Sequence, residues 1–209
     1  MAAENIAIDR DHAVGVIGAG HAGTAWARTA LRAGRTVVIA NSHGPDSLRS
    51  AVAALGEGAL ARTVDDAVAC PIVVLAVPWA AVASAVSGVD WGGRTVVDGT
   101  NPLLFPDLTP APLGGRTSSE IVAGLVPGAL LVKAGSHLSA ELLGQDPIAP
   151  GGQRVIFVSG DSAPAKQAII DLFNGAGFYP IDLGDLVSGG RMQQFGGPLA
   201  GHNLLQGAT

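Results

Sequence analysis

A glycine-rich segment near the start of the chain has the composition and spacing of a phosphate-binding loop. It follows an apolar stretch, residues 13–17, and reads Gly18-Ala19-Gly20-His21-Ala22-Gly23. In a GxGxxG turn the first glycine permits a tight bend, the second lets a pyrophosphate approach the backbone, and the third lets helix pack on strand. The N–H groups of Gly20, His21 and Ala22 would then face the phosphates at the positive end of the helix. The alternative is a glycine turn made only for packing, but a strand before the loop and a helix after it favour dinucleotide binding.

The end of the second predicted strand bears on the choice between NAD and NADP. NAD sites usually place Asp or Glu about 20 residues after the glycine loop, where it accepts a hydrogen bond from the ribose 2′-hydroxyl. Here the strand ends in Asn41-Ser42-His43-Gly44, with no carboxylate. Asn41 and Ser42 can donate hydrogen bonds to a 2′-phosphate, His43 can add partial positive charge, and Arg49 is a further candidate partner. Because a carboxylate there would repel the phosphate, its absence predicts NADP. The same residues also suit an ordinary turn before a helix.

Side chains for acid–base chemistry are few. Lys133 and His137 form the best candidate pair for a carbonyl or imine substrate, because either can protonate a developing alkoxide or amine. The alternative is a solvated loop lysine and a capping histidine. We find no motif for a catalytic triad and no His or Cys cluster at metal-ligand spacing. Hydride transfer from one ring to another needs no catalytic side chain, because the protein then sets only ring distance, stacking and electrostatics. We therefore predict no catalytic residue and no metal.

Alternating strands and helices must position these residues. The expected central strands cover residues 13–17, 36–40, 72–77, 95–97 and 130–132, with a weaker strand at 59–62, and the helices between them cover 22–33, 46–55, 79–86 and 118–125. Such alternation implies right-handed βαβ units and a doubly wound parallel sheet, a Rossmann α/β fold. The pattern then restarts on a smaller scale, with strands at 154–159 and 178–183, a helix at 163–174 and a glycine-broken helix at 191–206. We predict an NADP-binding Rossmann domain over residues 1–132 and a small C-terminal α/β substrate or cap domain over 133–209.

Composition excludes several classes of protein. The 209 residues include 12 Lys and Arg against 17 Asp and Glu, a net charge of −5, so the chain lacks the basic footprint of a nucleic-acid-binding protein. Residues 70–89 carry no charge over a length that spans a bilayer, but Pro71 and Pro78 interrupt them and their middle predicts a buried strand. The first ten residues lack the apolar core of a signal peptide. We expect a cytoplasmic protein without a membrane partner, and an inert, buried Cys70.

Several segments together resemble those of one family. They are the glycine loop, the turn Asn41-Ser42-His43-Gly44-Pro45, Val77-Pro78-Trp79, and Asp98-Gly99-Thr100-Asn101-Pro102. Ser119-Glu120-Ile121-Val122-Ala123 and Val132-Lys133-Ala134 extend the match. In these segments the chain resembles the NADPH:coenzyme F420 oxidoreductases, whose relatives include predicted dinucleotide-binding enzymes and the NADPH domains of membrane ferric reductases. Many dehydrogenases share the glycine loop, whereas its combination with the other segments is much more specific.

The resemblance implies hydride transfer between NADP(H) and a deazaflavin, coenzyme F420, or a flavin-like acceptor. By matching positions, Ala19 to Ala22 would hold the pyrophosphate, and Ser42 and His43 the 2′-phosphate. Val77, Pro78 and Trp79 would line the ribose and nicotinamide, and Asn101 would also bind the cofactor. The loop from Gly135 to Ala140 would close over the nicotinamide, with the acceptor against Ser136, His137, Leu138 and Ala140. The resemblance also implies a homodimer.

Two departures from the family pattern leave the acceptor open. His43 stands where relatives often carry Arg, and as a weaker, pH-dependent anion partner it predicts a modest preference for NADP. Gly135-Ser136-His137 stands where many relatives continue Phe-Asn-Thr. One alternative is an NADPH-dependent reductase of a small carbonyl or imine. Such enzymes usually add a long helical domain, for which the residues after 133 are too few and too rich in strands. Another is a regulatory module that binds NADPH without turnover.

Overall fold

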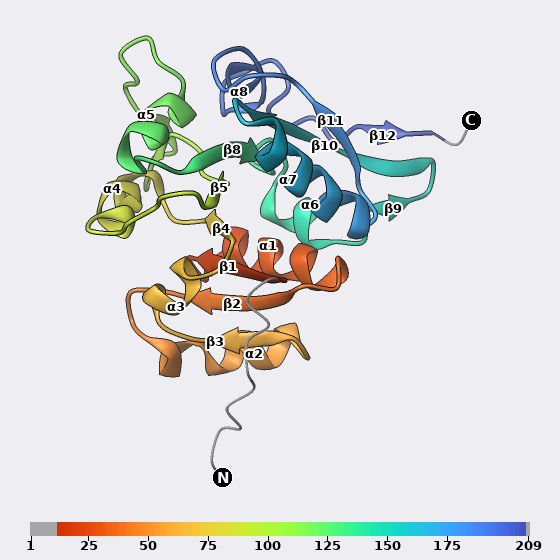
Figure 1. Cartoon of the computed structure of the whole chain (residues 1–209). Helices are drawn as coiled ribbons and strands as arrows, with labels where there is room; N and C mark the ends of the chain where they lie inside the picture. The colour runs from red at the N-terminus through yellow and green to blue at the C-terminus, as the bar shows by residue number, and fades with distance from the viewer. Residues whose placement is uncertain (1–11, 208–209) are drawn as a thin grey trace.

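Six neighbouring parallel strands form the larger part of one twisted sheet (Figure 1). The computed structural model describes residues 12–207. These six strands are β1 (Ala13–Ile17), β2 (Thr36–Ala40), β3 (Ala59–Ala61), β4 (Ile72–Leu75), β5 (Thr95–Asp98) and β8 (Leu130–Ala134). They lie side by side in the order β3-β2-β1-β4-β5-β8, and every neighbouring pair is parallel. This is the doubly wound order of a Rossmann fold, and it confirms the predicted fold class.

Helices cover both faces of this sheet, as two separate clusters of buried side chains require. One face carries α1 (His21–Arg32), the 3₁₀ helix η1 (Pro45–Leu48), α2 (Arg49–Leu55), α6 (Ala140–Gly144) and α7 (Ala163–Gly175). The other face carries α3 (Val64–Val68), η2 (Trp79–Ala81), α4 (Val82–Val86) and α5 (Ser118–Leu125). The central strands are therefore buried from both sides, which is why they read as continuous Val- and Ile-rich runs.

The residues that follow β8 extend the same sheet. The long strand β10 (Gly152–Gly160) pairs antiparallel with β8, and β11 (Tyr179–Asp182) pairs parallel with β10. Two short strands, β9 (Ile148–Ala149) and β12 (Leu205–Gln206), pair with the beginning of β10. A separate hairpin, β6 (Leu103–Leu104) with β7 (Thr109–Pro110), follows β5. Strand β8 pairs with β5 on one side and with β10 on the other. One continuous sheet therefore contains strands from both sides of residue 132.

The prediction of a glycine-broken helix over residues 191–206 is wrong. The structure has a helix of six residues, α8 (Ser188–Gln193), and then turns. Gly196 adopts a positive φ of 83°, and a Cβ at Gly197 would overlap backbone carbonyls of α8. Pro198 has no N–H group to continue a helical ladder. The chain therefore folds back on α8 instead of extending it.

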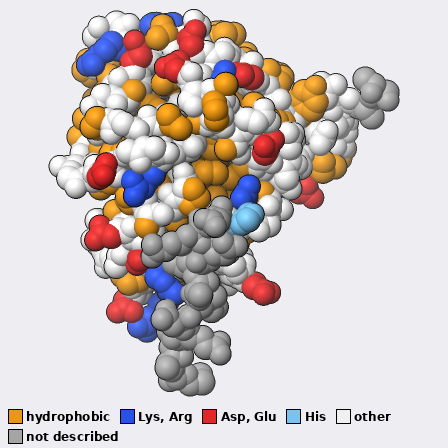
Figure 2. Space-filling view, in the orientation of Figure 1, with side chains coloured by type: hydrophobic (Ala, Val, Ile, Leu, Met, Phe, Trp, Pro, Cys, Tyr) orange, Lys and Arg blue, Asp and Glu red, His pale blue; other side chains and the backbone are white. Residues whose placement is uncertain are grey.

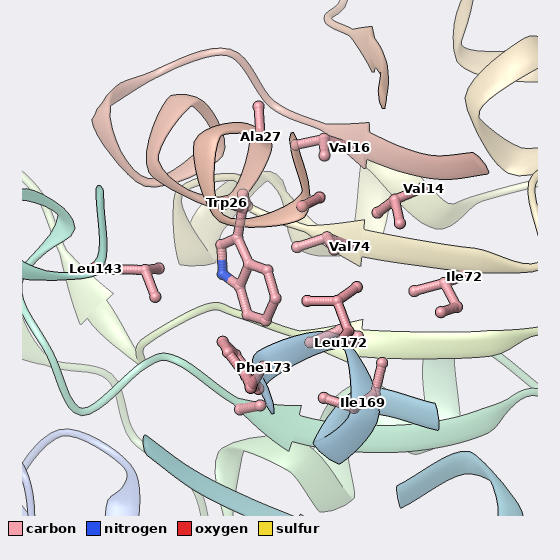
Figure 3. Close-up of a cluster of buried hydrophobic side chains, with 14 of the residues drawn as sticks. Val14, Val16, Trp26, Ala27, Ile72, Val74, Leu143, Ile169, Leu172 and Phe173 are labelled. Carbon is pink, nitrogen blue, oxygen red and sulfur yellow. The ribbon is translucent and has the colours of Figure 1, made fainter. Parts of the chain in front are cut away.

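Trp26 on α1 connects the core to the loops at one edge of the sheet. Its side chain is 1% exposed, and its ring packs on Phe173 of α7 with the centroids 5.2 Å apart (Figure 3). Gly99, directly after β5, lies so close that a Cβ there would be 2.8 Å from Trp26 Nε1. A Cβ at Gly135, directly after β8, would be 2.7 Å from the same ring. Trp26 therefore fixes the path of two loops at the carboxyl edge of the sheet. The local sequence pattern does not single out Trp26.

Surface charge and helix length are the features that concern binding to nucleic acids and to membranes. Figure 2 shows charged side chains of both signs spread over this face and not gathered into a basic stripe. Within residues 12–207, each helix is too short or too polar to cross a bilayer. The charge-free stretch that begins at Cys70 resolves into β4, η2 and α4, and Cys70 itself is buried.

Candidate dinucleotide-binding site

A cavity of about 850 Å³ lies at the carboxyl ends of β1, β2 and β4. After β1 the chain crosses to one side of the sheet, and from β4 onwards it continues on the other side. The crevice at such a switch point is where open α/β sheets bind ligands. Its walls come from the glycine loop, the turn after β2, the segment after β4, and the helices α2 to α4.

The three glycines of the loop have distinct surroundings. Gly18 has a φ of +109°, and a Cβ there would overlap the carbonyl oxygen of Ala76. A Cβ at Gly23 would overlap the carbonyl oxygen of Gly18, so the absence of a side chain lets α1 pack against the loop. At Gly20, by contrast, a Cβ would meet nothing within 4 Å. Gly18 and Gly23 therefore shape the loop, and Gly20 leaves open space on the cavity side.

The start of α1 faces that open space without a side-chain cap. Gly20 is the N-cap residue, no side chain accepts a hydrogen bond from the first turn, and that turn has no acidic residue. The first N–H groups of a helix have no partner within it, and they carry partial positive charge. The loop therefore fits a diphosphate: it has room above Gly20, uncapped donors beside it, and no carboxylate in the first turn to repel an anion.

The turn after β2 is organised by Asn41. Its side-chain oxygen accepts a hydrogen bond from the backbone N–H of His43 at 3.0 Å, and its amide nitrogen donates to Ser47 Oγ at 3.0 Å. This arrangement leaves Ser42 and His43 exposed on the cavity wall. Ser47 and Ser50 also line the cavity. The local sequence does not single out these two serines, because it does not determine how η1 and α2 are rotated relative to the sheet.

Five residues of the predicted cofactor site are absent from the described lining of this cavity: His21, Ala22, Arg49, Trp79 and Asn101. Arg49 pairs with Asp46 at 2.6 Å, with both side chains at least 80% exposed. Trp79 packs against the buried cluster on the α3–α5 face, while its neighbours Val77 and Pro78 line the cavity. Asn101 joins two other segments through hydrogen bonds. Its side-chain nitrogen donates to the Ser136 carbonyl at 2.7 Å, and its side-chain oxygen accepts from the Phe195 N–H at 3.1 Å.

A second cavity, of about 680 Å³, adjoins the first at Ala19 and Gly20. It lies between α1 and α6, so the two helices and the glycine loop form its walls. The side of α1 that begins with His21 faces this second cavity, whereas the described lining of the first does not include His21.

The predicted acceptor loop turns inward. Ser136, His137 and Leu138 are 6%, 2% and 7% exposed and are absent from the described lining of both cavities, whereas Ala140 lines the second. The His137 ring packs on Phe157 of β10 with centroids 4.6 Å apart. Burial lowers the pKa of His137 to about 4, with the backbone of Val155 opposing this effect. His137 is therefore a neutral, buried side chain at neutral pH.

We expect His137 to produce a pH-dependent loss of stability. Its pKa is 6.5 in its ordinary state and about 4 in the folded protein. Between these two pH values the imidazole is protonated in the unfolded chain and neutral in the folded chain. Stability is then full above about pH 6.5 and declines by roughly 3 kcal/mol as the pH falls to about 4. Urea unfolding of His137→Phe should show a flatter profile over this interval. The exposed His202→Phe is the matched control, and an equal flattening in both variants would contradict the assignment.

Lys133 lies in strand β8, not in a solvated loop as one alternative held. Its side chain and that of Asp98 are both 0% exposed and form an ion pair, with Nζ 3.1 Å from Oδ2. Lys133 Nζ also donates to the Thr100 carbonyl at 2.9 Å. Asp98 accepts further hydrogen bonds from Ser119 Oγ and from the hydroxyl and backbone N–H of Thr100. The pair joins the ends of β5 and β8 to the start of α5.

The protonation state of Asp98 follows from this network. Burial is the largest influence and by itself would raise the pKa of the Asp98 carboxyl. The charge of Lys133 and the hydrogen bonds from Ser119 and Thr100 together outweigh it, so the pKa of Asp98 lies below its ordinary value. Lys133 is therefore held by a buried carboxylate rather than presented to either described cavity.

The segment after α8 closes over this edge of the sheet. Gln193 donates to the Lys133 carbonyl at 3.1 Å and to Ser159 Oγ at 2.8 Å. Gln194 accepts a hydrogen bond from the Ser118 N–H at 2.8 Å, and Phe195 N–H binds Asn101. Within the described residues, no group of three or more His, Cys, Asp and Glu side chains has an arrangement that holds a metal ion.

Comparison with known proteins places the chain among nucleotide-dependent oxidoreductases. The family model described as "NADP oxidoreductase coenzyme F420-dependent" matches residues 13–102, which contain both the glycine loop and the turn after β2. A solved structure described as an F420-dependent NADP reductase, from Arthrobacter sp. FB24, has a TM-score of 0.71 and 26% identity, over 84% of this chain and 85% of that one. The chain belongs to this family. Members of the F420-dependent NADP oxidoreductase family are NADP-dependent oxidoreductases.

Two further proteins are similar to this chain, one at higher sequence identity and one at the same identity. Hypothetical protein SMa0349 from Sinorhizobium meliloti shares 45% identity and a TM-score of 0.87, over 93% of this chain and 94% of that one. The rat metalloreductase STEAP3 is 26% identical over 177 residues, which is 84% of this chain. The chain spans about a third of the length of that metalloreductase, 34%.

Proposed function

We propose that this family member transfers a hydride between NADP(H) and a deazaflavin of the coenzyme F420 type or a flavin-like ring. The observation that carries the proposal is the pair of adjoining cavities that share Ala19 and Gly20. The first has the features of a dinucleotide site, and the second offers space for another ligand beside the same loop. Two ring systems need to meet for such a transfer, and the protein's task is to bring them together.

In this proposal each wall of the first cavity has one task. The uncapped start of α1 holds the diphosphate above Gly20. Ser42 and His43, exposed beyond β2, receive the 2′-phosphate, while Val77 and Pro78 pack against the ribose and the ring that follows it. The bound cofactor supplies a hydride, and one proton from water completes the two-electron reduction of the acceptor ring. We further propose that residues 1–132 serve the cofactor and residues 133–209 complete the acceptor side.

Reduction of a small carbonyl or imine is the second candidate, and the structure offers it less support. That chemistry calls for a proton donor beside the substrate. Lys133 is engaged with Asp98 and Thr100, and His137 packs on Phe157. Both side chains are 2% exposed or less. The two donors that the sequence offered are therefore withdrawn from the cavities.

Purified protein mixed with NADPH and different acceptors tests the proposal. With F420 we expect loss of the deazaflavin absorbance together with oxidation of NADPH. Reduction of free flavin or of a ferric chelate, with F420 inert, would move the assignment toward the metalloreductase relative. Turnover of carbonyls or imines would favour the second candidate. Tight NADPH binding without any turnover would identify a regulatory module.

Ser42→Asp should discriminate between the two nicotinamide cofactors. The new carboxylate lies on the wall where we place the 2′-phosphate, so charge repulsion weakens NADPH binding by about tenfold or more. NADH has no phosphate there, and a carboxylate at this position suits its ribose hydroxyl. Fluorescence titration of the same variant with NADPH and with NADH provides the internal control. Equal losses for both cofactors would contradict this placement of the 2′-phosphate.

A further inference from the structure

The cavity between α1 and α6, called the slot below, lies beside the glycine loop. Its walls carry small residues on both helices, Ala25 on one side and Ala140 and Gly144 on the other, with Ala19 and Gly20 at the end that joins the first cavity. The two helices pack closely where these small residues meet, since a Cβ at Gly144 would be 3.4 Å from the Cβ of Ala25. A volume of about 680 Å³ lies within the range of about 300–1,000 Å³ usual for ligand sites.

One guanidinium group on the slot has no partner. Arg28 of α1 is exposed and lines the cavity, and among residues 12–207 it makes no hydrogen bond or ion pair. Its neighbour Arg32 donates to the Gly144 carbonyl and so serves to hold α6 against α1. The acidic side chain on the slot, Glu141, is engaged by Gln145 Nε2 at 3.1 Å. The charge of Arg28 therefore remains available to a ligand.

The position of Arg28 separates it from the diphosphate site. It follows His21, the first residue of α1, by seven positions, which at about 1.5 Å per residue places their Cα atoms about 10 Å apart along the helix axis. The uncapped N–H groups and Arg28 are thus two anion-binding features at opposite ends of one slot. Arginine is the side chain best suited to phosphate, because its planar fork donates two parallel hydrogen bonds.

We propose that the slot binds the hydride acceptor, and that this acceptor is a planar heteroaromatic ring whose side chain carries a phosphate bound by Arg28. The inference rests on the proposed function for the identity of the acceptor. The small residues leave room for a flat ring beside Ala19 and Gly20, next to the dinucleotide cavity. The ring's side chain then runs along α1 toward Arg28. Arg28 is the residue that determines specificity for acceptors with an anionic tail.

Two pairs of ligands that share a ring and differ in the tail test this assignment. Riboflavin lacks the phosphate of FMN, and 8-hydroxy-5-deazariboflavin lacks the anionic tail of F420. In fluorescence titrations of NADP-saturated protein, we expect at least one tailed ligand to bind about tenfold more tightly than its tailless partner. Arg28→Ala should reduce that ratio to about one without weakening the tailless ligand. Arg116→Ala, an exposed arginine before α5, should leave the ratio unchanged.

Three results would overturn the assignment. The first is an unchanged ratio in Arg28→Ala. The second is a loss of NADPH affinity in Arg28→Ala without acceptor, since Arg28 would then serve the cofactor. The third is failure of the wild-type protein to bind any of the four ligands. Because these are binding measurements, they are independent of turnover. An Arg28-dependent ratio with no hydride transfer would support the slot as a phosphate-ligand site and reject only the proposed reaction.

Discussion

Replacing Gly20 with aspartate should weaken NADPH binding by about 100-fold or more while the protein stays folded. A Cβ at this position meets nothing within 4 Å, and the residue is the N-cap of α1 with an extended backbone, φ −78° and ψ −167°. Aspartate is a favoured N-cap residue, so the change in stability should stay within about 1 kcal/mol. The carboxylate, however, would occupy the diphosphate position and bind its N–H donors. Two like charges about 4 Å apart at an effective dielectric of about 20 repel by about 4 kcal/mol.

Fluorescence titration with NADPH and thermal unfolding together check this prediction. Gly20→Asn adds a side chain of the same size without the charge, so its affinity should fall between those of the wild type and Gly20→Asp. Gly124 of α5 also has open space around a Cβ, and Gly124→Asp is the control for a new carboxylate elsewhere. If Gly20→Asp bound NADPH as tightly as the wild type does, the diphosphate could not lie at this loop.

Lys133→Met should destabilise the protein by about 3–5 kcal/mol at neutral pH, because it leaves the Asp98 carboxylate buried and unpaired. Asp98 keeps hydrogen bonds from Ser119 and Thr100, but no positive charge remains beside it. The double variant Asp98→Asn/Lys133→Met removes both charges and should recover much of the loss. Urea unfolding measures all three free energies. A double variant no more stable than Lys133→Met would show that the charge imbalance is not the cause.

The pH dependence of this pair has a defined sign. In the wild type the pKa of Asp98 lies below its ordinary value, so its contribution is complete above about pH 4 and is lost as the pH falls further. In Lys133→Met the effect of burial is unopposed by a charge, and we expect the pKa of Asp98 to rise. The variant then takes up a proton on folding, and its deficit relative to the wild type should narrow between about pH 7 and pH 4. A deficit that widens over this range would contradict the assignment.

The strands and the glycine loop could be predicted because their signals are local. A strand buried on both faces must be apolar throughout, and β1, β2 and β4 show this in four or five consecutive residues. The loop needs glycine where φ is positive or where the backbone comes close, and both demands hold within six residues. The predicted helix over residues 191–206 failed because Gly196 and Gly201 adopt positive φ and Gly197 lies against backbone carbonyls of α8. Periodicity does not record either feature.

What the sequence by itself determined is the class of fold and the glycine loop after β1, since each depends on residues that are neighbours along the chain. Only the tertiary structure decided which polar residues face a ligand. It buried Lys133 against Asp98, thirty-five positions away, and turned His137 onto Phe157. It also left Arg28 on the slot without a hydrogen bond or ion pair to any residue from 12 to 207. These outcomes depend on helix rotation and on contacts between distant segments. The free energy of burying a charge or a ring is settled by those contacts and not by the neighbouring residues in the chain.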